Sequence, residues 1–165
     1  MKTLKLALSI LTVLVGCSTA SAQIGSLPKK DASLREGVDA KFKVGDVWEY
    51  TTRKGEEKST LVILKIDESS ELGLIIHIAV EKIKLANCNG GPSPSTVPHM
   101  PFALKVLNES VTKKIESNHA LPDFREGYDE WKEAYSKKKA GIYTIGGSGA
   151  VAVAEKTYQS ALGCG

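Results

Sequence analysis

Three successive apolar segments in the first half of the chain constrain its fold more than any other feature. In residues 42–53, large side chains from Trp48 onward alternate with polar ones, which is typical of a half-buried strand. Residues 60–66 are apolar on both faces through their middle, and residues 72–83 present a core face formed by Leu74, Ile76, Ile78 and Val80. Short polar connections join the three segments, so we expect an antiparallel meander.

The pattern changes after a break in composition at residues 87–98. This stretch holds three prolines and two glycines, so we expect it to form neither a strand nor a helix. Helical spacing follows it in residues 124–139 and 148–162, and in a stripe formed by Leu104, Leu107, Val111 and Ile115. Residues 142–145 predict a short strand between the last two helices. The order of these predicted strands and helices predicts an α+β fold, in which a small antiparallel meander is packed on one face by two or three helices.

An aromatic stripe runs along the second predicted helix. Its members repeat at spacings that place them on one helix face, and they are Phe124, Tyr128, Trp131 and Tyr135. The first interpretation is that this stripe is the core face of the helix. Because Tyr and Trp are enriched at binding interfaces, the stripe is also our candidate partner surface.

Residues 1–22 have the pattern of an export leader. Lys2 and Lys5 precede an apolar run of about ten residues, far fewer than the roughly 20 that span a bilayer. Two cleavage sites compete within it. Leu14-Val15-Gly16-Cys17 resembles a lipobox, which would leave Cys17 lipidated, whereas Ala20-Ser21-Ala22 resembles an ordinary secretory cleavage site.

Residues 23–41 contain few large apolar side chains and predict a flexible tether. A spacer of this kind is what a lipid-anchored domain needs, so the tether favours lipidation at Cys17. We therefore expect one globular domain over residues 42–165 in the bacterial cell envelope. The expected location is the periplasm, anchored to a membrane through lipid alone, with a soluble periplasmic or secreted protein as the alternative.

The cysteines predict a cross-link. Cys17 is lipidated or removed under either cleavage, so Cys88 and Cys164 remain as an even pair in an oxidising compartment. A disulfide between them would close a loop of about 76 residues, for which the chain-entropy model gives about 4 kcal/mol. Two buried thiols are the alternative.

The charge balance argues against nucleic acid as a partner. The formal net charge of +3 includes Lys2 and Lys5 of the leader, so the mature chain carries about +1. A chain so nearly neutral gives no support to an anionic membrane surface as a partner either. Its lysine runs are interpreted as solvated faces.

A glycine-rich turn precedes the last predicted helix. Gly147-x-Gly149-x-x-Ala152 after a predicted strand has the form of a dinucleotide-binding turn. That motif needs a further strand with an acidic residue about 20 positions on, and only 13 residues follow Ala152. We therefore expect a flexible turn, no nucleotide and no cofactor.

The histidines and serines show no pattern of a known catalytic or metal centre. Zinc sites usually include two ligands that are close together in the sequence. The histidines of this chain, which are His77, His99 and His119, are much farther apart, so we expect no metal site. No Gly-x-Ser-x-Gly elbow occurs, and we predict neither catalytic residues nor enzyme activity. We expect His77 to be a packed core histidine and His99 to be a contact at the start of the first helix.

Several short motifs spread over residues 42–145 resemble a family of small uncharacterised exported bacterial proteins. The motifs are Val44-Gly45-Asp46-Val47-Trp48-Glu49-Tyr50, Ile75-Ile76-His77-Ile78-Ala79-Val80, His99-Met100-Pro101-Phe102-Ala103, Leu121-Pro122-Asp123-Phe124, Gly127-Tyr128, Trp131 and Lys139-Ala140-Gly141-Ile142-Tyr143. That family has no assigned activity. The resemblance implies a single bacterial domain and carries over no functional residue.

Export, small size and the lack of a catalytic pattern favour a protein that acts by binding. The most specific hypothesis is an immunity or inhibitor protein that neutralises a toxin or hydrolase in the periplasm. Two alternatives stay open. One is a small envelope hydrolase with His77 or His99 as its base, in a site between residues 87–98 and the sheet, and the other is a structural envelope lipoprotein.

Overall fold

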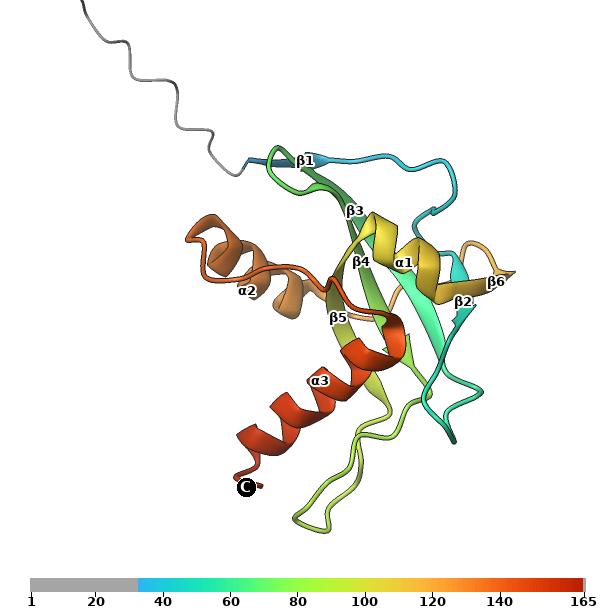
Figure 1. Ribbon diagram of the computed structural model, residues 1–165, viewed down its shortest axis with the longest axis vertical. Coiled ribbons are helices and arrows are strands. Elements are labelled where there is room, and N and C mark those ends of the chain that lie inside the picture. The colour runs from blue at the N-terminus through green and yellow to red at the C-terminus, as the bar shows by residue number, and fades with distance from the viewer. Residues whose placement is uncertain (1–32, 165) are drawn as a thin grey trace, which may run out of the picture.

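The computed structural model describes residues 33–164, which form one antiparallel sheet and three helices (Figure 1). The strands and helices are β1 (Leu34–Glu36), β2 (Val47–Tyr50), β3 (Thr60–Ser69), β4 (Gly73–Glu81), β5 (Thr96–Ala103), α1 (Leu104–Ser110), β6 (Val111–Glu116), α2 (Arg125–Ser136) and α3 (Gly147–Ala161). The sheet order is β5-β4-β3-β2-β6, and β1 also pairs with β3. The predicted α+β class and the β2-β3-β4 meander are confirmed.

The helices divide between the two faces of the sheet, where one covered face was expected. Ile76, Ile78 and Val80 of β4 pack in the main apolar core with residues of α1 and α3. The alternate residue Ile75 packs with the aromatic side chains of α2. Because successive strand side chains point to opposite faces, α2 lies across the sheet from α1 and α3. Figure 1 shows α1 and α3 in front of the sheet and α2 beside β5.

A bulge in β3 decides which of its side chains face α2. The pairing of β3 with β4 shifts between Ile63 and Lys65, so Leu64 is an extra residue in the ladder. Before the shift, Ile63 packs in the main core, and after it Ile66 does so. The insertion turns Lys65 and Asp67 toward α2, because one extra residue exchanges the two faces of a strand.

The predicted first helix is shorter than its apolar stripe. α1 ends at Ser110, and Val111–Glu116 forms β6, which pairs antiparallel with β2. β-branched residues such as Val111 and Ile115 suit an extended chain, and the open edge of β2 supplies hydrogen-bond partners that a lone helix end lacks. Tertiary pairing therefore overrides the helical spacing.

Two further expectations about strands were wrong. Residues 96–98 belong to β5 and were expected to lie in a loop, while residues 142–145 contribute a single bridge between Tyr143 and Phe102. β5 is an edge strand, which tolerates its two prolines because one side of the strand needs no ladder donors.

Part of the predicted tether is paired with the sheet. Leu34–Glu36 forms β1, which pairs with residues 67–69 of β3, and the exposed Arg35 contacts Glu68. The sheet therefore includes residues that precede Phe42, the expected first residue of the domain. The predicted leader at 1–22 and the predicted lipidation site at Cys17 lie outside the described residues.

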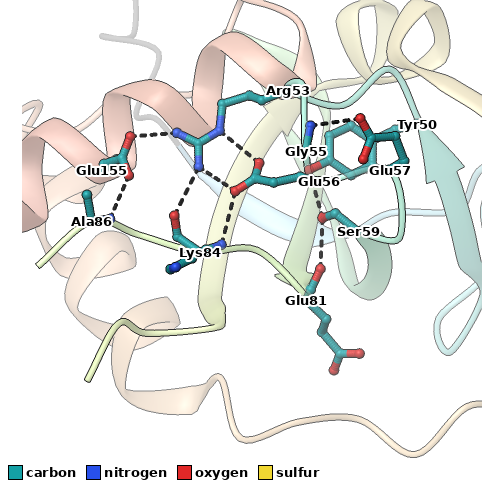
Figure 2. A network of polar contacts seen from close by, with 10 residues as sticks. All are labelled: Tyr50, Arg53, Gly55, Glu56, Glu57, Ser59, Glu81, Lys84, Ala86 and Glu155. Atoms are coloured by element: carbon teal, nitrogen blue, oxygen red, sulfur yellow. Dashed lines mark hydrogen bonds and ion pairs between the residues drawn. The ribbon is translucent and has the colours of Figure 1, made fainter.

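A disulfide and an ion-pair network hold α3 to the rest of the domain. Cys88 and Cys164 form the predicted disulfide, with Cα atoms 6.2 Å apart. Figure 2 shows the guanidinium of Arg53 between two carboxylates, donating to Glu155 at 2.6 Å and to Glu56 at 2.8 Å. The same carboxylates accept backbone N–H groups of Ala86 at 2.7 Å and Lys84 at 3.0 Å.

The glycine-rich turn has a packing role. α3 begins at Gly147, where a side-chain Cβ would lie 2.6 Å from the ring of Tyr50. The N–H of Gly147 donates to Ser110 Oγ at 3.1 Å. Absence of a side chain therefore lets the start of α3 approach β2 closely, which is a sufficient reason for glycine at this position.

Candidate functional site

A cleft of about 610 Å³ lies between α2, β5 and residues 141–143. Its lining combines aromatic and aliphatic side chains with two polar ones, and consists of His99, Pro101, Gly127, Glu130, Trp131, Ala134, Gly141, Ile142 and Tyr143. Pockets that bind ligands commonly combine polar groups with aliphatic and aromatic side chains, as this lining does.

A buried chain of polar side chains leads from the floor of this cleft into the sheet. Nε2 of His99 lies 2.9 Å from Nδ1 of His77, whose side chain is completely buried. Nε2 of His77 lies 3.3 Å from Oδ2 of Asp67 but makes no aligned hydrogen bond within the described residues. The contact to Asp67 is therefore mainly electrostatic.

Asp67, which we call the hub because several of these polar side chains contact it, is itself buried, with 2% of its surface exposed. Tyr128 donates its hydroxyl proton to Oδ2 of Asp67 at 2.6 Å, and Lys65 contacts Oδ1. A buried carboxylate is tolerated when it is paired and hydrogen-bonded, and these partners meet that condition.

The neighbours of the hub set the charge states along the chain. Burial alone would raise the pKa of Asp67, but the contacts with His77, Lys65 and Tyr128 outweigh burial and hold that pKa well below its usual range. Burial and the carboxylate of Asp67 raise the pKa of Tyr128. At neutral pH, Asp67 is therefore an anion and Tyr128 is a hydrogen-bond donor.

Both histidines are neutral at pH 7. Burial lowers the pKa of His77, although Asp67 opposes that effect. Burial, and then the charge that His77 would carry, lower the pKa of His99 to about 4. A neutral imidazole has one nitrogen that donates and one that accepts, so each ring has one lone pair available.

The aromatic stripe of α2 forms the wall between this chain and the solvent. Tyr128, Trp131 and Tyr135 are buried, as expected for a core face, and Phe124 is partly buried. The buried rings also make hydrogen bonds. The indole of Trp131 donates to the carbonyl oxygen of Gly141 at 2.7 Å, and the hydroxyls of Tyr135 and Ser69 are 2.6 Å apart.

Gly127 allows α2 to approach β5 closely. A Cβ at this position would lie 3.1 Å from Cβ and 3.8 Å from Nδ1 of His99. Nδ1 of His99 is therefore on the Gly127 side of the ring, opposite the nitrogen that bonds to His77. No hydrogen bond to this Nδ1 is found in the described part of the chain.

The structure brings together some of the predicted residues and places others elsewhere. Trp131 lines the cleft and Tyr128 bonds to the hub, whereas Tyr135 packs farther along α2. Phe124 lines a separate hollow with residues 121–125.

His77 and His99, which lie 22 residues apart in the sequence, are in contact in the structure. His77 is the packed core histidine that its strand predicted. His99 belongs to β5 and contacts His77, so its predicted position at the start of the first helix was wrong. Sequence reasoning also missed Asp67, which it placed in a polar connection just after the second strand.

Residues 33–164 contain no group of three histidine, cysteine or acidic side chains arranged to hold a metal ion. Among the helices of the same described part, none has the length and apolar character needed to cross a membrane.

No family model, curated protein or solved structure matches this chain. The function must therefore be argued from the site itself.

Proposed function

We propose that this is an exported protein of the bacterial envelope that acts by binding another protein, with the cleft beside α2 as its recognition surface. The observation that carries the proposal is His99 in the lining of the cleft, with no hydrogen bond to its Nδ1 in the described part of the chain. A polar atom held by a buried chain, and left without a protein partner, is a preorganised group for a ligand.

The leading form of this proposal is an immunity or inhibitor protein. Such a protein needs a rigid surface that receives a projecting part of its target and needs no chemistry of its own. Here α2 is fixed to β3 through Tyr128 and Tyr135, so one wall of the cleft is held by buried hydrogen bonds. Rigid walls lower the cost of ordering on binding.

A small hydrolase is the second candidate, because Asp67, His77 and His99 form a chain that ends in a possible base. Two observations make this the weaker candidate. Within the described chain, the residues that line the cleft include no serine, threonine or cysteine. A pKa of about 4 also makes His99 a weak base at neutral pH.

The test compares two leucine variants as baits in envelope extracts. Ala134→Leu fills the cleft from α2, and Ser136→Leu adds the same side chain at an exposed position two residues away. We expect the wild type and Ser136→Leu to capture one and the same protein, and Ala134→Leu to lose it. Equal capture by both variants, or no specific protein with any bait, would refute the proposal.

The hydrolase candidate has its own readout. A panel of ester, amide and glycoside substrates should remain unhydrolysed by the wild-type protein under the conditions of capture. Turnover that Ala134→Leu abolishes and Ser136→Leu retains would replace binding by catalysis as the function.

A further inference from the structure

We propose, on the basis of the binding function above, that the cleft recognises a cationic side chain, an alkylammonium or guanidinium on an apolar stem as in lysine and arginine. The proposal names the chemical group that the partner protein places in the cleft. It depends on which nitrogen of His99 carries a lone pair, on the charges that line the cleft, and on its apolar walls.

The buried chain determines the lone pair of His99. The carboxylate of Asp67 lies 3.3 Å from Nε2 of His77 and therefore favours a proton on that nitrogen. Nδ1 of His77 is then an acceptor, and it accepts the proton of His99 Nε2 across 2.9 Å. With its proton on Nε2, neutral His99 has an unprotonated Nδ1, so the cleft presents an acceptor.

The charges of the lining also favour a cation. Glu130 is exposed and is the single formally charged residue among the described residues that line the cleft. No lysine or arginine belongs to that described lining, so an anionic ligand would meet a carboxylate and a lone pair without a counter-charge. A ligand that donates hydrogen bonds and carries positive charge satisfies both groups.

The walls fit an apolar stem. Pro101, Ala134 and Ile142 supply aliphatic surface, and Trp131 and Tyr143 supply aromatic rings. Lysine and arginine bury their methylene stems while their charged ends find polar partners. The rings add cation–π attraction for a charged group near their faces.

Free amines and protein side chains share this chemistry, and we assign the group to a protein. A free amine offers only its own stem to the apolar wall. A side chain of a folded partner brings neighbouring surface as well, which can also cover the exposed Glu130.

The first experiment measures charge recognition directly. Nα-acetyl-lysine methylamide and the uncharged Nα-acetyl-norleucine methylamide are titrated into the ¹⁵N-labelled protein, with the Trp131 indole and the Gly141 amide as NMR reporters. We expect the lysine probe to shift both signals and to bind at least fivefold more tightly than the norleucine probe. Equal affinities, or shifts confined to other parts of the domain, would overturn the proposal.

Matched variants locate the charge. Glu130→Gln removes the carboxylate of the cleft, and Asp129→Asn removes a neighbouring exposed carboxylate that does not line it. We expect Glu130→Gln to weaken the lysine probe at least threefold and Asp129→Asn to leave it unchanged. An equal loss of affinity with both variants would indicate that the overall negative charge of α2 attracts the probe. That result would contradict recognition in the cleft.

The two proposals can fail separately. If the captured protein depends on position 134 but the two probes bind equally, the binding function stands and cation recognition fails. If the lysine probe binds in the cleft but no protein is captured, the ligand is a free amine and the assignment to a protein fails. Release of the captured protein by excess lysine probe, and not by the norleucine probe, would support both.

Discussion

Two polar networks join helices to the sheet, and they differ in how they end. The network under α3 is closed, because the carboxylates of Glu56 and Glu155 pair with Arg53 and accept backbone N–H groups (Figure 2). The network under α2 is open. It runs from Asp67 through His77 to His99, whose outer nitrogen faces the cleft without a partner in the described chain.

The difference separates a structural role from a binding role. A closed network compensates its own desolvation and contributes to stability only through the elements that it joins. The open network leaves Nδ1 of His99 without a hydrogen-bond partner in the described part of the chain, on a residue that lines the cleft, so a ligand can bond to it. We infer that the α3 side of the molecule serves stability and that the α2 side serves recognition.

The largest expected effect comes from the disulfide on the α3 side. Replacing Cys88 and Cys164 by serine together should lower the free energy of unfolding by about 4 kcal/mol, since the bond closes a long loop. Urea unfolding measures this loss. Binding of the lysine probe at 25 °C should stay within twofold of wild type, and a large loss of affinity in the folded variant would contradict the separation of the two sides.

The closed network should give the next largest effect. Arg53→Met leaves the carboxylates of Glu56 and Glu155 without their cation, and we expect a loss of about 2–3 kcal/mol in unfolding free energy. Glu57→Gln is a control on the same connection, because the Glu57 side chain is exposed. Unchanged stability of Arg53→Met would show that the network is not structural.

The open network should make stability depend on pH. The pKa of His99 in the folded protein is about 4, below the ordinary value of about 6.5, so the unfolded chain takes up the proton first. The His99 contribution is complete above about pH 6.5 and is lost as pH falls toward 4, a change of less than about 3 kcal/mol because solvent screens the partly exposed ring. Urea midpoints across this range measure it.

His99→Phe is the control for this pH dependence. The variant lacks the titrating ring and should show a smaller decrease over the same pH range, with the share of His77 remaining. Asp67 is protonated only at lower pH, because its pKa is lowered in the folded protein and is about 3.9 in the unfolded chain. Its effect on stability is therefore confined to pH values below this range. An identical decrease in wild type and His99→Phe would exclude His99 as its source.

The smallest effect on stability is expected at the contact between α2 and β5. Gly127→Ala gains helix propensity of about 1 kcal/mol, but its Cβ would lie 3.1 Å from that of His99 and must displace it slightly. We expect stability within about 1 kcal/mol of wild type and a severalfold loss of lysine-probe affinity. Gly149→Ala in α3, where a Cβ would make only ordinary contact with Ile145 at 3.5 Å and which does not line the cleft, is the matched control.

Sequence patterns predicted the closed side of the molecule better than the open side. The disulfide followed from an even pair of cysteines, and the last helix followed from its apolar spacing and its terminal glycine. Both depend on local sequence or on simple counting. The division of helices between two faces could not be read in the same way, because each helix spacing gives an apolar face and not the side of the sheet that it covers.

The open site depends on features without a local signal. A bulge at Leu64 turns Asp67 toward α2, and strict alternation would have turned it toward the apolar core. The strand that holds His99 begins at Thr96, and Pro98 within it was one of the three prolines that predicted a loop over residues 87–98. Weak hints were present in the polar Asp67 at the end of an apolar run and in the glycine before Tyr128, but neither of them indicates which residues meet in space.

The positions of the ring protons on His77 and His99 decide whether the cleft presents a hydrogen-bond acceptor. Long-range ¹H–¹⁵N correlation spectra at pH 7 distinguish protonated from unprotonated ring nitrogens. The account predicts neutral rings that carry their protons on Nε2, which leaves Nδ1 of His99 unprotonated toward the cleft. A proton on Nδ1 of His99, as the other tautomer or as a cationic ring, would contradict it, because the cleft would then present a donor.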